Sequence, residues 1–333
     1  MPANAPPRSG LMSRTYLVTG GAGFIGGHLV DALLADGHRV RVVDDLSTGS
    51  LDNLRRHEGD PSLEVTVGSV CDRRLLEPLA DGADAIFHLA AVVGVGRVME
   101  SPIATIETGT RGMDVVMNIA ARRMVPMLFT STSEVYGKSA DLPLQEDGDL
   151  LFGPTFRGRW SYACAKALDE YLALAFHREK GVPVTIARLF NTVGPRQSPR
   201  FGMVLPRFVG RALRGEPLPV YGDGSHTRCF TSVHDVVWAL RRLMDCEAAR
   251  GQVFNVGSTE AISILDLAHL VKSHLRSHSA IRFVPYAEAF DEDFEESIDR
   301  LPDLSRVQAM IGYRPRRTLL QTIDDIVEHG IDD

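Results

Sequence analysis

Cysteine and long apolar stretches are both scarce in this chain. It has only four cysteines, which are scattered and form no CxxC pair: Cys71, Cys164, Cys229 and Cys246. Disulfide frameworks and zinc sites need closer or patterned spacing, so we expect reduced thiols, no metal site and a cytoplasmic protein. No stretch of about 18 apolar residues occurs, and residues 1–13 lack the apolar segment of a signal peptide. We therefore expect no membrane partner, and a disordered lead-in over residues 1–13.

An excess of basic residues is missing as well. The chain has 36 lysines and arginines against 43 aspartates and glutamates, which gives a formal net charge of -7. Because nucleic-acid surfaces need clustered Lys and Arg, this balance predicts no nucleic-acid partner. A small phosphorylated ligand remains compatible, since it needs only a few local cations. The length of 333 residues allows about two domains.

The first half of the chain alternates between β-branched apolar runs and helical patterns. In the first helical pattern, Ile25, Leu29, Val30 and Leu33 share one face, and Gly37 is placed to end the helix. This alternation is typical of α/β proteins, and we predict a Rossmann-type, doubly wound parallel sheet with helices on both faces. The expected strands are Thr15–Thr19, Arg39–Asp44, Leu63–Val67, Ala85–Ala90, Met127–Thr130 and Val184–Leu189.

Proline and glycine become frequent after Asn191, which indicates a second, smaller α/β domain for the substrate. A strand-and-helix unit at Cys229–Leu243 and a strand at Val253–Val256 then resume the earlier pattern. We expect a Rossmann domain over residues 14–190, to which residues 229–257 return, and a C-terminal domain formed by residues 191–228 and 258–333. Within the latter we expect a helix over Pro206–Leu213 and a strand at Ile281–Val284.

A glycine-rich turn follows the first strand and opens the first helix, in the segment Val18-Thr-Gly20-Gly-Ala-Gly23-Phe-Ile-Gly26. Its glycines permit a tight turn and bring backbone N–H groups close to a pyrophosphate at the positive end of the helix. Asp44 ends the second strand, where a carboxylate accepts hydrogen bonds from a ribose 2′-OH and repels a 2′-phosphate. The predicted cofactor is therefore NAD rather than NADP. Asp45 is equally consistent with a solvated loop.

A tyrosine and a lysine are placed to form a catalytic pair. Tyr162 and Lys166 are four residues apart in a helical pattern from Trp160 to about His177, so they share a helix face. A buried ammonium beside a phenol favours the phenolate, and Tyr162 could then act as a base near neutral pH. The segment Thr130-Ser-Thr-Ser-Glu134-Val-Tyr-Gly137 ends the fifth strand, and ligands of open α/β sheets bind at such carboxyl ends.

The glycine turn, the strand-end segment and the Tyr-x-x-x-Lys pair, in this order, resemble the extended short-chain dehydrogenases/reductases that act on nucleotide sugars. The resemblance covers about residues 15 to 330. It implies that Tyr162 is the base, that Lys166 is its electrostatic partner and the anchor of the nicotinamide ribose, and that Thr132 or Ser133 supplies a third hydroxyl. His88 is interpreted as a packed structural histidine. The predicted cofactor-binding residues are Gly20, Gly23, Phe24, Ile25, Gly26, Asp44, Asp45, Ser47, Thr48, Val70, Leu89, Ala90, Ala91, Tyr162 and Lys166.

The second half contains segments similar to those with which this family grips the nucleotide. The resemblance implies that Asn191 and Arg228 contact the diphosphate, and a dianionic diphosphate suits the forked guanidinium of Arg228. Arg196 and Arg207 are weaker candidates for the same role. The residues expected to wall the base are Met203, Val204, Leu205 and Tyr221.

The strand-end segment separates the reactions of this family. Ser133 stands where 4,6-dehydratases carry the Asp that protonates the leaving hydroxyl, and many 4-epimerases have a small or hydroxyl residue in place of Glu134. The pattern Thr-Ser-Glu-Val-Tyr-Gly is instead similar to that of UDP-glucuronic acid decarboxylases. Arg300, before Leu-Pro-Asp303, and Arg159, before Trp160, extend this similarity and are expected near the sugar, whereas Val92–Val95 departs from it. The predicted catalytic residues are Thr132, Ser133, Glu134, Tyr162, Lys166 and Arg300.

The resemblance thus implies NAD-dependent decarboxylation of UDP-glucuronic acid through a UDP-4-keto intermediate, to UDP-xylose or to a released UDP-4-keto-pentose. A UDP-sugar 4-epimerase and an NDP-sugar 4,6-dehydratase remain open as alternatives. A non-catalytic sensor of NAD or of a nucleotide sugar is the alternative of a different class, although such proteins typically lose the Tyr or the Lys. The resemblance also implies a homodimer, joined through a four-helix contact by residues 103–122 and 161–178.

Overall fold

The computed structural model describes residues 13–91, 101–199, 203–285, 288 and 299–330. The expected disordered lead-in, except for Ser13, and the departure at Val92–Val95 lie outside the described residues. Within the described part of the chain, no helix is long and apolar enough to cross a membrane.

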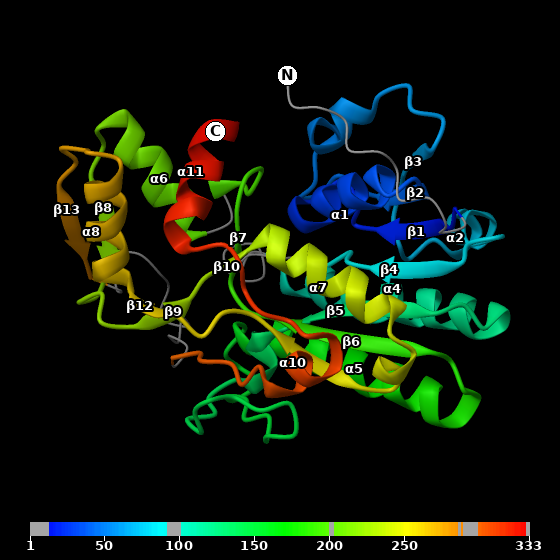
Figure 1. Cartoon of the computed structure of the whole chain (residues 1–333). Coiled ribbons are helices and arrows are strands. Elements are labelled where there is room, and N and C mark those ends of the chain that lie inside the picture. Colours follow the sequence, from blue (N-terminus) through cyan, green and yellow to red (C-terminus); the bar gives the residue numbers. More distant parts are fainter. Residues whose placement is uncertain (1–12, 92–100, 200–202, 286–287, 289–298, 331–333) are drawn as a thin grey trace.

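A seven-stranded parallel sheet forms the centre of the molecule (Figure 1), with the order β11-β6-β5-β4-β1-β2-β3. The chain begins in the middle at β1, runs to one edge and crosses back to β4, so the switch point lies between β1 and β4. Open α/β sheets bind ligands at this point, beyond the carboxyl ends of the strands. The predicted fold class is confirmed. The strands are β1 Thr15–Thr19, β2 Arg39–Asp44, β3 Leu63–Val67, β4 Ala85–His88, β5 Met127–Thr132, β6 Val184–Leu189 and β11 Val253–Val256.

Two of the expected strand ends were wrong by two residues. β4 stops at His88: the Leu89 N–H still donates to the Thr19 carbonyl at 3.0 Å, but the Ala90 N–H is directed at the Thr19 hydroxyl at 3.4 Å. β5 continues to Thr132 because residues 130–132 still pair with residues 187–189 of β6. The strand-end segment therefore leaves the sheet only at Ser133.

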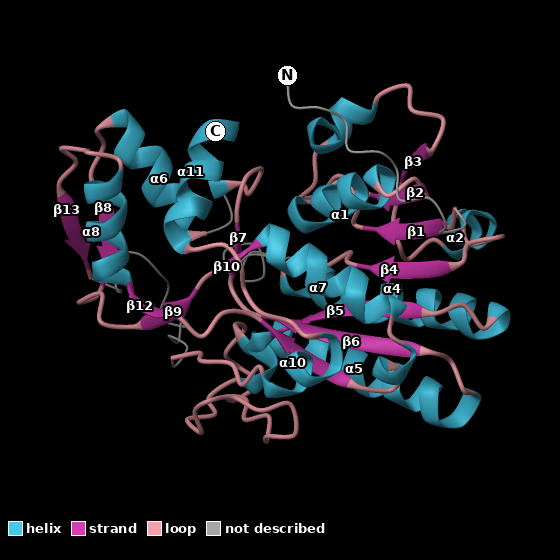
Figure 2. Ribbon diagram, viewed as in Figure 1, coloured by secondary structure: helices cyan, strands magenta, loops and turns pink. Residues whose placement is uncertain are grey.

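Helices cover both faces of the sheet because successive residues of each strand point to opposite sides. Val18 and Phe87 pack on one side, while their neighbours Leu17 and Ile86 pack on the other. The first side is covered by α1 (Phe24–Ala35) and α7 (Val233–Asp245), which cross the sheet in Figure 2. The second side is covered by α2 (Arg73–Leu79), α4 (Pro102–Arg123) and α5 (Trp160–Lys180).

A smaller lobe has a hydrophobic core of its own, which includes Leu205, Phe208, Leu267 and Ile323. In Figure 2 the arrowheads of β1 and β4 point toward this lobe, so it faces the carboxyl ends of the sheet. It is built from α6 Val204–Arg214, β8 Leu218–Tyr221, α8 Ile264–His274, β13 Ile281–Val284 and α11 Leu319–His329. The helix expected from Pro206 begins two residues earlier, which places this proline in the first turn, where its missing N–H costs little.

Short strands connect the lobe to the sheet. The expected single strand after Cys229 is wrong: residues 227–232 form two strands, because the first pairs with β12 in the lobe and the second pairs with β7 beside the sheet. The short strands, short helical turns and α10 have the following bounds: η1 Leu51–His57, η2 Ser133–Tyr136, β7 Thr192–Val193, β9 Thr227–Cys229, β10 Thr231–Ser232, η4 Glu247–Ala249, β12 Ala261–Ser263 and α10 Ser305–Ile311.

Candidate active site

The turn between β1 and α1 depends on glycine. Gly20 has a φ of +72°, and a Cβ there would lie 2.7 Å from the backbone nitrogen of Ala90. A Cβ on Gly26 would meet the carbonyl oxygen of Gly20. Gly23 is the N-cap of α1, and no side chain caps the helix, so the first-turn N–H groups at Phe24 and Ile25 can bind a pyrophosphate.

Asp44 holds this turn in place from the end of β2. Its carboxylate is buried and accepts the N–H groups of Ala22 at 3.0 Å and Leu46 at 2.9 Å. Burial raises the pKa of Asp44, against the effect of these hydrogen bonds. A carboxylate has about four acceptor positions, so acceptor positions remain for ribose hydroxyls. Asp45, in contrast, is exposed and accepts the N–H of Ser47 at 2.9 Å within its own turn.

The remaining residues expected at the cofactor lie at neighbouring strand ends. Val70 follows β3 and is buried against Gly112 of α4, where a Cβ would lie 2.7 Å from the valine side chain. Residues 89–91 follow β4, and Thr48 follows β2 in a half-buried loop. Because the sheet order is β4-β1-β2-β3, all these segments lie along one edge with the glycine turn. The cradle therefore fits the adenosine and pyrophosphate of NAD.

Lys166 is buried at the centre of this edge. Its Nζ donates a hydrogen bond to the carbonyl oxygen of Thr130 at 3.1 Å and lies 4.5 Å from the ring centroid of Phe129. Burial lowers the pKa of Lys166, while Asp169 and Glu170 oppose this shift. Two further ammonium hydrogens remain for a ligand.

The phenol of Tyr162 has a raised pKa, caused by burial first and then by Glu134 and Asp169. Burial and the two carboxylates thus favour the protonated phenol in the protein by itself, against the expectation that Tyr162 is a base near neutral pH without a ligand. The ammonium of Lys166 is directed at the Thr130 carbonyl. Deprotonation of Tyr162 must depend on positive charge that a bound ligand adds.

His88 is a structural residue, as interpreted from the sequence. It is buried, its Nδ1 lies 2.7 Å from the Thr19 hydroxyl, and its ring stacks on that of Phe129. Burial, with a smaller contribution from Lys166, lowers the pKa of His88 to about 3, so the imidazole is neutral.

Glu134, which acts on Tyr162, also meets Arg300. The Nη1 of Arg300 donates to the carboxylate of Glu134 at 3.3 Å and to the Ser133 hydroxyl at 3.5 Å, although the residues are 166 and 167 positions apart. The Glu134 N–H donates to the hydroxyl of Thr132 at 3.2 Å, so this hydroxyl keeps its own hydrogen for a substrate oxygen.

Three guanidinium groups act on this one carboxylate. Burial raises the pKa of Glu134, but Arg300, Arg159 and Arg228 together outweigh it and lower the pKa. Residues 228 and 300 are also joined by a parallel β-bridge, which brings the lobe to the end of β5. Guanidinium groups bind phosphate and carboxylate groups through charge-assisted hydrogen bonds, so this end of the site suits an anionic ligand.

The residues expected around the nucleotide base differ in burial and in contacts. Tyr221 and Arg207 form a pair, in which the guanidinium donates to the phenol at 3.0 Å and lies 4.9 Å from the ring centroid. Met203 and Val204 are half-buried at the start of α6, whereas Leu205 is fully buried in the core of the lobe. The expected contact of Leu205 with a base is therefore wrong, because its side chain faces the lobe interior.

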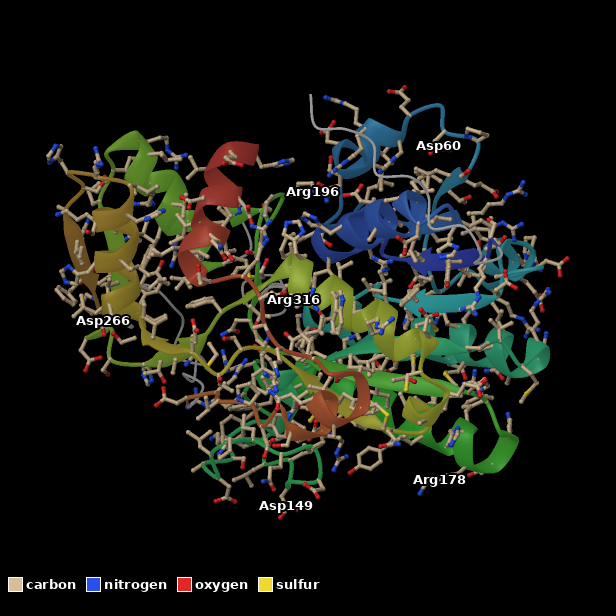
Figure 3. All side chains as sticks on the ribbon, viewed as in Figure 1. Asp60, Asp149, Arg178, Arg196, Asp266 and Arg316 are labelled. Carbon is tan, nitrogen blue, oxygen red and sulfur yellow. The ribbon has the colours of Figure 1, made fainter. Side chains whose placement is uncertain are left out.

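Asn191 and Arg196 lie near the join between the sheet and the lobe. Asn191 is half-buried, and its carbonyl oxygen accepts the N–H of Thr231 at 3.0 Å. The Nη2 of Arg196 donates to Asp31 at 2.6 Å and its Nη1 donates to the Asn53 carbonyl at 2.8 Å. Arg196 therefore packs against α1 (Figure 3) and is not available to a diphosphate.

Sequence reasoning missed one acidic group at this site. Asp169 is buried three residues after Lys166 on α5, and it acts on both Lys166 and Tyr162. The spacing of three residues on one helix was a signal that could have identified it, since such residues share a face.

A parallel sheet with a glycine turn, a strand-end carboxylate and a Tyr-x-x-x-Lys pair defines a nicotinamide-dependent enzyme of the short-chain dehydrogenase/reductase type. The family model for the NAD dependent epimerase/dehydratase family matches residues 16–257, and the chain belongs to this family. The predicted cofactor, NAD, is confirmed by this membership.

Individual relatives extend the similarity over nearly the whole chain. The chain is 38% identical to a UDP-N-acetyl-alpha-D-glucosaminuronate decarboxylase of Bacillus cytotoxicus, over 95% of this chain and 98% of the relative. It is 36% identical to UDP-glucuronic acid decarboxylase 1 of Danio rerio, over 95% of this chain and 72% of the relative. Among solved structures, UDP-glucose 4-epimerase of Thermotoga maritima superimposes with a TM-score of 0.84 and 30% identity, covering 95% of this chain and 98% of that one.

Proposed function

We propose that this enzyme decarboxylates UDP-glucuronic acid with NAD. The observation that carries the proposal is the convergence of Arg159, Arg228 and Arg300 on Glu134, beside Tyr162. A hexuronate brings both a diphosphate and a C6 carboxylate, and guanidinium groups bind both through charge-assisted hydrogen bonds. Relatives along nearly the whole chain are named as decarboxylases of UDP-hexuronates.

NAD, held by the β1–α1 turn, Asp44 and Lys166, supplies the acceptor for the hydride on sugar C4. Tyr162 takes the proton of the O4 hydroxyl, and the hydroxyl of Thr132 orients the same oxygen. The phenol of Tyr162 resists deprotonation in the protein by itself, because its pKa is raised. The positive charge of the oxidised nicotinamide would favour the phenolate, so NAD must be bound before the proton moves.

The C4 ketone makes loss of carbon dioxide feasible. The carboxylate at C6 is then β to the ketone, so the electrons of the C5–C6 bond move onto the ketone oxygen as carbon dioxide leaves. A hydroxyl such as that of Thr132 stabilises this enolate, and a preorganised donor of this kind contributes about 3–4 kcal/mol. Protonation at C5 and reduction at C4 give UDP-xylose. If the ketone leaves before reduction, the product is a UDP-4-keto-pentose.

Arg300 binds the C6 carboxylate in this scheme. Its guanidinium lies within hydrogen-bonding range of Glu134 and Ser133, so its orientation is fixed before the substrate enters. It then holds the carboxylate until carbon dioxide leaves. A 4,6-dehydratase would instead need an acid at Ser133, and this hydroxyl accepts a hydrogen bond from the arginine.

A second candidate substrate is UDP-N-acetylglucosaminuronic acid, which carries the same carboxylate. It is favoured by the Bacillus cytotoxicus relative, which is named for this activity and matches at 38% identity. The two substrates differ only at C2, so the chemistry at C4 to C6 is the same for both.

The test is incubation of the enzyme with NAD and each UDP-hexuronate, followed by mass analysis of the sugar nucleotide. We expect loss of carbon dioxide from at least one of them, and the faster substrate identifies the C2 group. UDP-glucose and dTDP-glucose are the controls for epimerisation and for loss of water. Turnover of a control sugar with both hexuronates left intact would overturn the proposal. Binding of NAD and UDP-sugar with no turnover of any would indicate the sensor.

We also propose that the enzyme is a homodimer joined through α4 and α5. Large apolar side chains are exposed on these two helices, including Ile103 and Ile106 on α4 and Leu168 and Tyr171 on α5. Light scattering should give twice the chain mass, and Leu168→Arg should give the monomer. A wild-type monomer at micromolar concentration would overturn this contact.

All four cysteines are free, which supports a reducing location such as the cytoplasm.

A further inference from the structure

Four charged side chains are buried together behind Tyr162. Lys166, Asp169 and Glu170 belong to α5 and Arg188 belongs to β6, and each is 5% exposed or less. Glu170 is already paired, because its carboxylate accepts the Nη2 of Arg188 at 2.7 Å, the Nε of Arg188 at 3.0 Å and the Ser131 hydroxyl. Asp169 is thus the carboxylate left to balance the ammonium of Lys166.

Asp169 occupies a space that a glycine leaves open. It faces Gly109 of α4, and a Cβ on this glycine would lie 3.7 Å from the Oδ2 of Asp169. Within residues 13–91, 101–199, 203–285 and 299–330, we find no hydrogen bond or ion pair to the Asp169 carboxylate, and Lys166 donates to Thr130 instead. Asp169 and Lys166 therefore interact through space in a buried setting, where charges attract more strongly than in water.

Burial of this carboxylate without a hydrogen bond is costly. Burial raises the pKa of Asp169 to about 6, with a further contribution from Glu170, and Lys166 opposes the rise. A carboxylate whose only role was to fill the gap between α4 and α5 would be replaced at no electrostatic cost by a neutral side chain. A buried carboxylate with a raised pKa at the edge of a candidate active site is therefore a candidate functional residue.

We propose that Asp169 is a positioning residue that keeps Lys166 protonated in its buried site. A buried ammonium tends to lose its proton, and a nearby carboxylate opposes this loss. The charge on Lys166 is what the proposed function requires beside Tyr162 and the ribose of NAD, and to this extent the inference rests on that function.

The surroundings make Asp169→Asn a change of charge with little change of shape. The charged or titratable groups that face Asp169 are Lys166 and Glu170 on its own helix and Tyr162, on which it acts. Arg188 reaches the cluster from β6 through Glu170, and α4 presents Gly109, which has no side chain. Glu134 acts on Tyr162 from η2 and remains unchanged in the variant.

The chain is well suited to a direct test, because it contains only four lysines: Lys138, Lys166, Lys180 and Lys272. Carbon NMR of protein labelled at lysine Cε and loaded with NAD should resolve four signals, and Lys166→Gln assigns the signal of interest. We expect the titration midpoint of Lys166 to fall by about 1 pH unit in Asp169→Asn. Glu179→Gln, an exposed carboxylate-to-amide change at the end of the same helix, should leave it in place.

A relocated carboxylate separates charge from packing. In the double variant Asp169→Ala/Gly109→Asp, α4 supplies the carboxylate to the same space, and we expect the midpoint of Lys166 to return toward the wild-type value. Asp169→Ala alone should behave as Asp169→Asn does. An unchanged Lys166 titration in Asp169→Asn would overturn the inference.

The titration of Lys166 and the release of carbon dioxide are independent measurements. If Lys166 responds to Asp169 while neither UDP-hexuronate is decarboxylated, the proposed function fails and the role of Asp169 stands. If carbon dioxide is released while Lys166 does not respond, the reverse holds.

Discussion

The two sides of Tyr162 balance their charges in opposite ways. On the side of the lobe, the guanidiniums of Arg159, Arg228 and Arg300 act on one carboxylate, and the pKa of Glu134 is lowered. On the side of α5, Lys166 and Arg188 face two carboxylates, and the pKa of Asp169 is raised.

This difference assigns a task to each side. The lobe side presents guanidinium groups, which suit an anionic substrate. The α5 side is neutral without any ligand and is almost wholly buried, so it can set the charge of Lys166 before anything binds.

The largest expected effect is at the residue between the two sides. Tyr162→Phe should lower turnover by about 10²–10⁴-fold, the usual contribution of a positioned proton acceptor, while NAD and UDP still bind. Stopped-flow or steady-state release of carbon dioxide measures the loss, and calorimetry measures the two affinities. Near-full activity in this variant would show that Tyr162 is not the base.

Removing charge from the lobe side should give the next effect. Arg300→Ala should slow release of carbon dioxide by about 10–100-fold, because a charge-assisted hydrogen bond to the carboxylate contributes about 1.5–3 kcal/mol. It should also weaken the preference for UDP-glucuronate over UDP-glucose and leave the affinity for UDP unchanged. Arg282→Ala, at an exposed position in β13, is the control.

Two outcomes would contradict this assignment. Carbon dioxide release within twofold of wild type would show that Arg300 does not bind the carboxylate. A collapse of UDP affinity with release retained would make Arg300 a phosphate ligand instead.

The sheet could be predicted from the sequence because its strands are buried on both faces and therefore appear as continuous β-branched runs. Four of the six expected strands in the first half have the predicted bounds, Val184–Leu189 among them. The two-residue strands β7 and β10 could not be predicted, because two residues are too few to show a strand pattern and the strands form through the pairing of residues 192–193 with 231–232.

The site could be predicted in its groups but not in its charges. Arg300 donates to Glu134, which acts on Tyr162, and Lys166 lies one helical turn after Tyr162 on α5. The direction in which Lys166 points, toward the Thr130 carbonyl, depends on how α5 packs on β5, and the raised pKa of the Tyr162 phenol depends on its burial and on two carboxylates in the folded chain. Arg196 was likewise ambiguous in the sequence, since nothing local indicates that Asp31 of α1 takes its guanidinium.

Asp44 is another buried carboxylate, stabilised by backbone N–H groups rather than by cations. NAD should bind more tightly than NADP, because a 2′-phosphate would meet this carboxylate in a confined site. Asp44→Ala should narrow that preference by about tenfold, which corresponds to one charge-assisted hydrogen bond. Fluorescence titration with both dinucleotides measures it. Equal affinities in the wild-type enzyme would contradict the role of Asp44.

The last expected effect concerns stability rather than turnover or binding, and it tests the α5 side most directly. The pKa of Asp169 is raised to about 6 from 3.8, chiefly by burial, so the folded protein holds a proton there over a pH range in which the unfolded chain has lost it. The stabilisation from this proton is complete below the unfolded value and is lost as the pH rises through about 6. Asp169→Asn carries no such penalty.

This variant should therefore resemble wild type in free energy of unfolding near pH 4 and exceed it by about 1–3 kcal/mol at pH 8. Urea unfolding at the two pH values measures the difference, and Glu179→Gln should show none. A gain of the same size at both pH values would mean that Asn simply packs better between α4 and α5. A loss at pH 8 would mean that the attraction of Asp169 to Lys166 outweighs the cost of its burial, and the cluster would then stabilise the fold rather than draw stability from it.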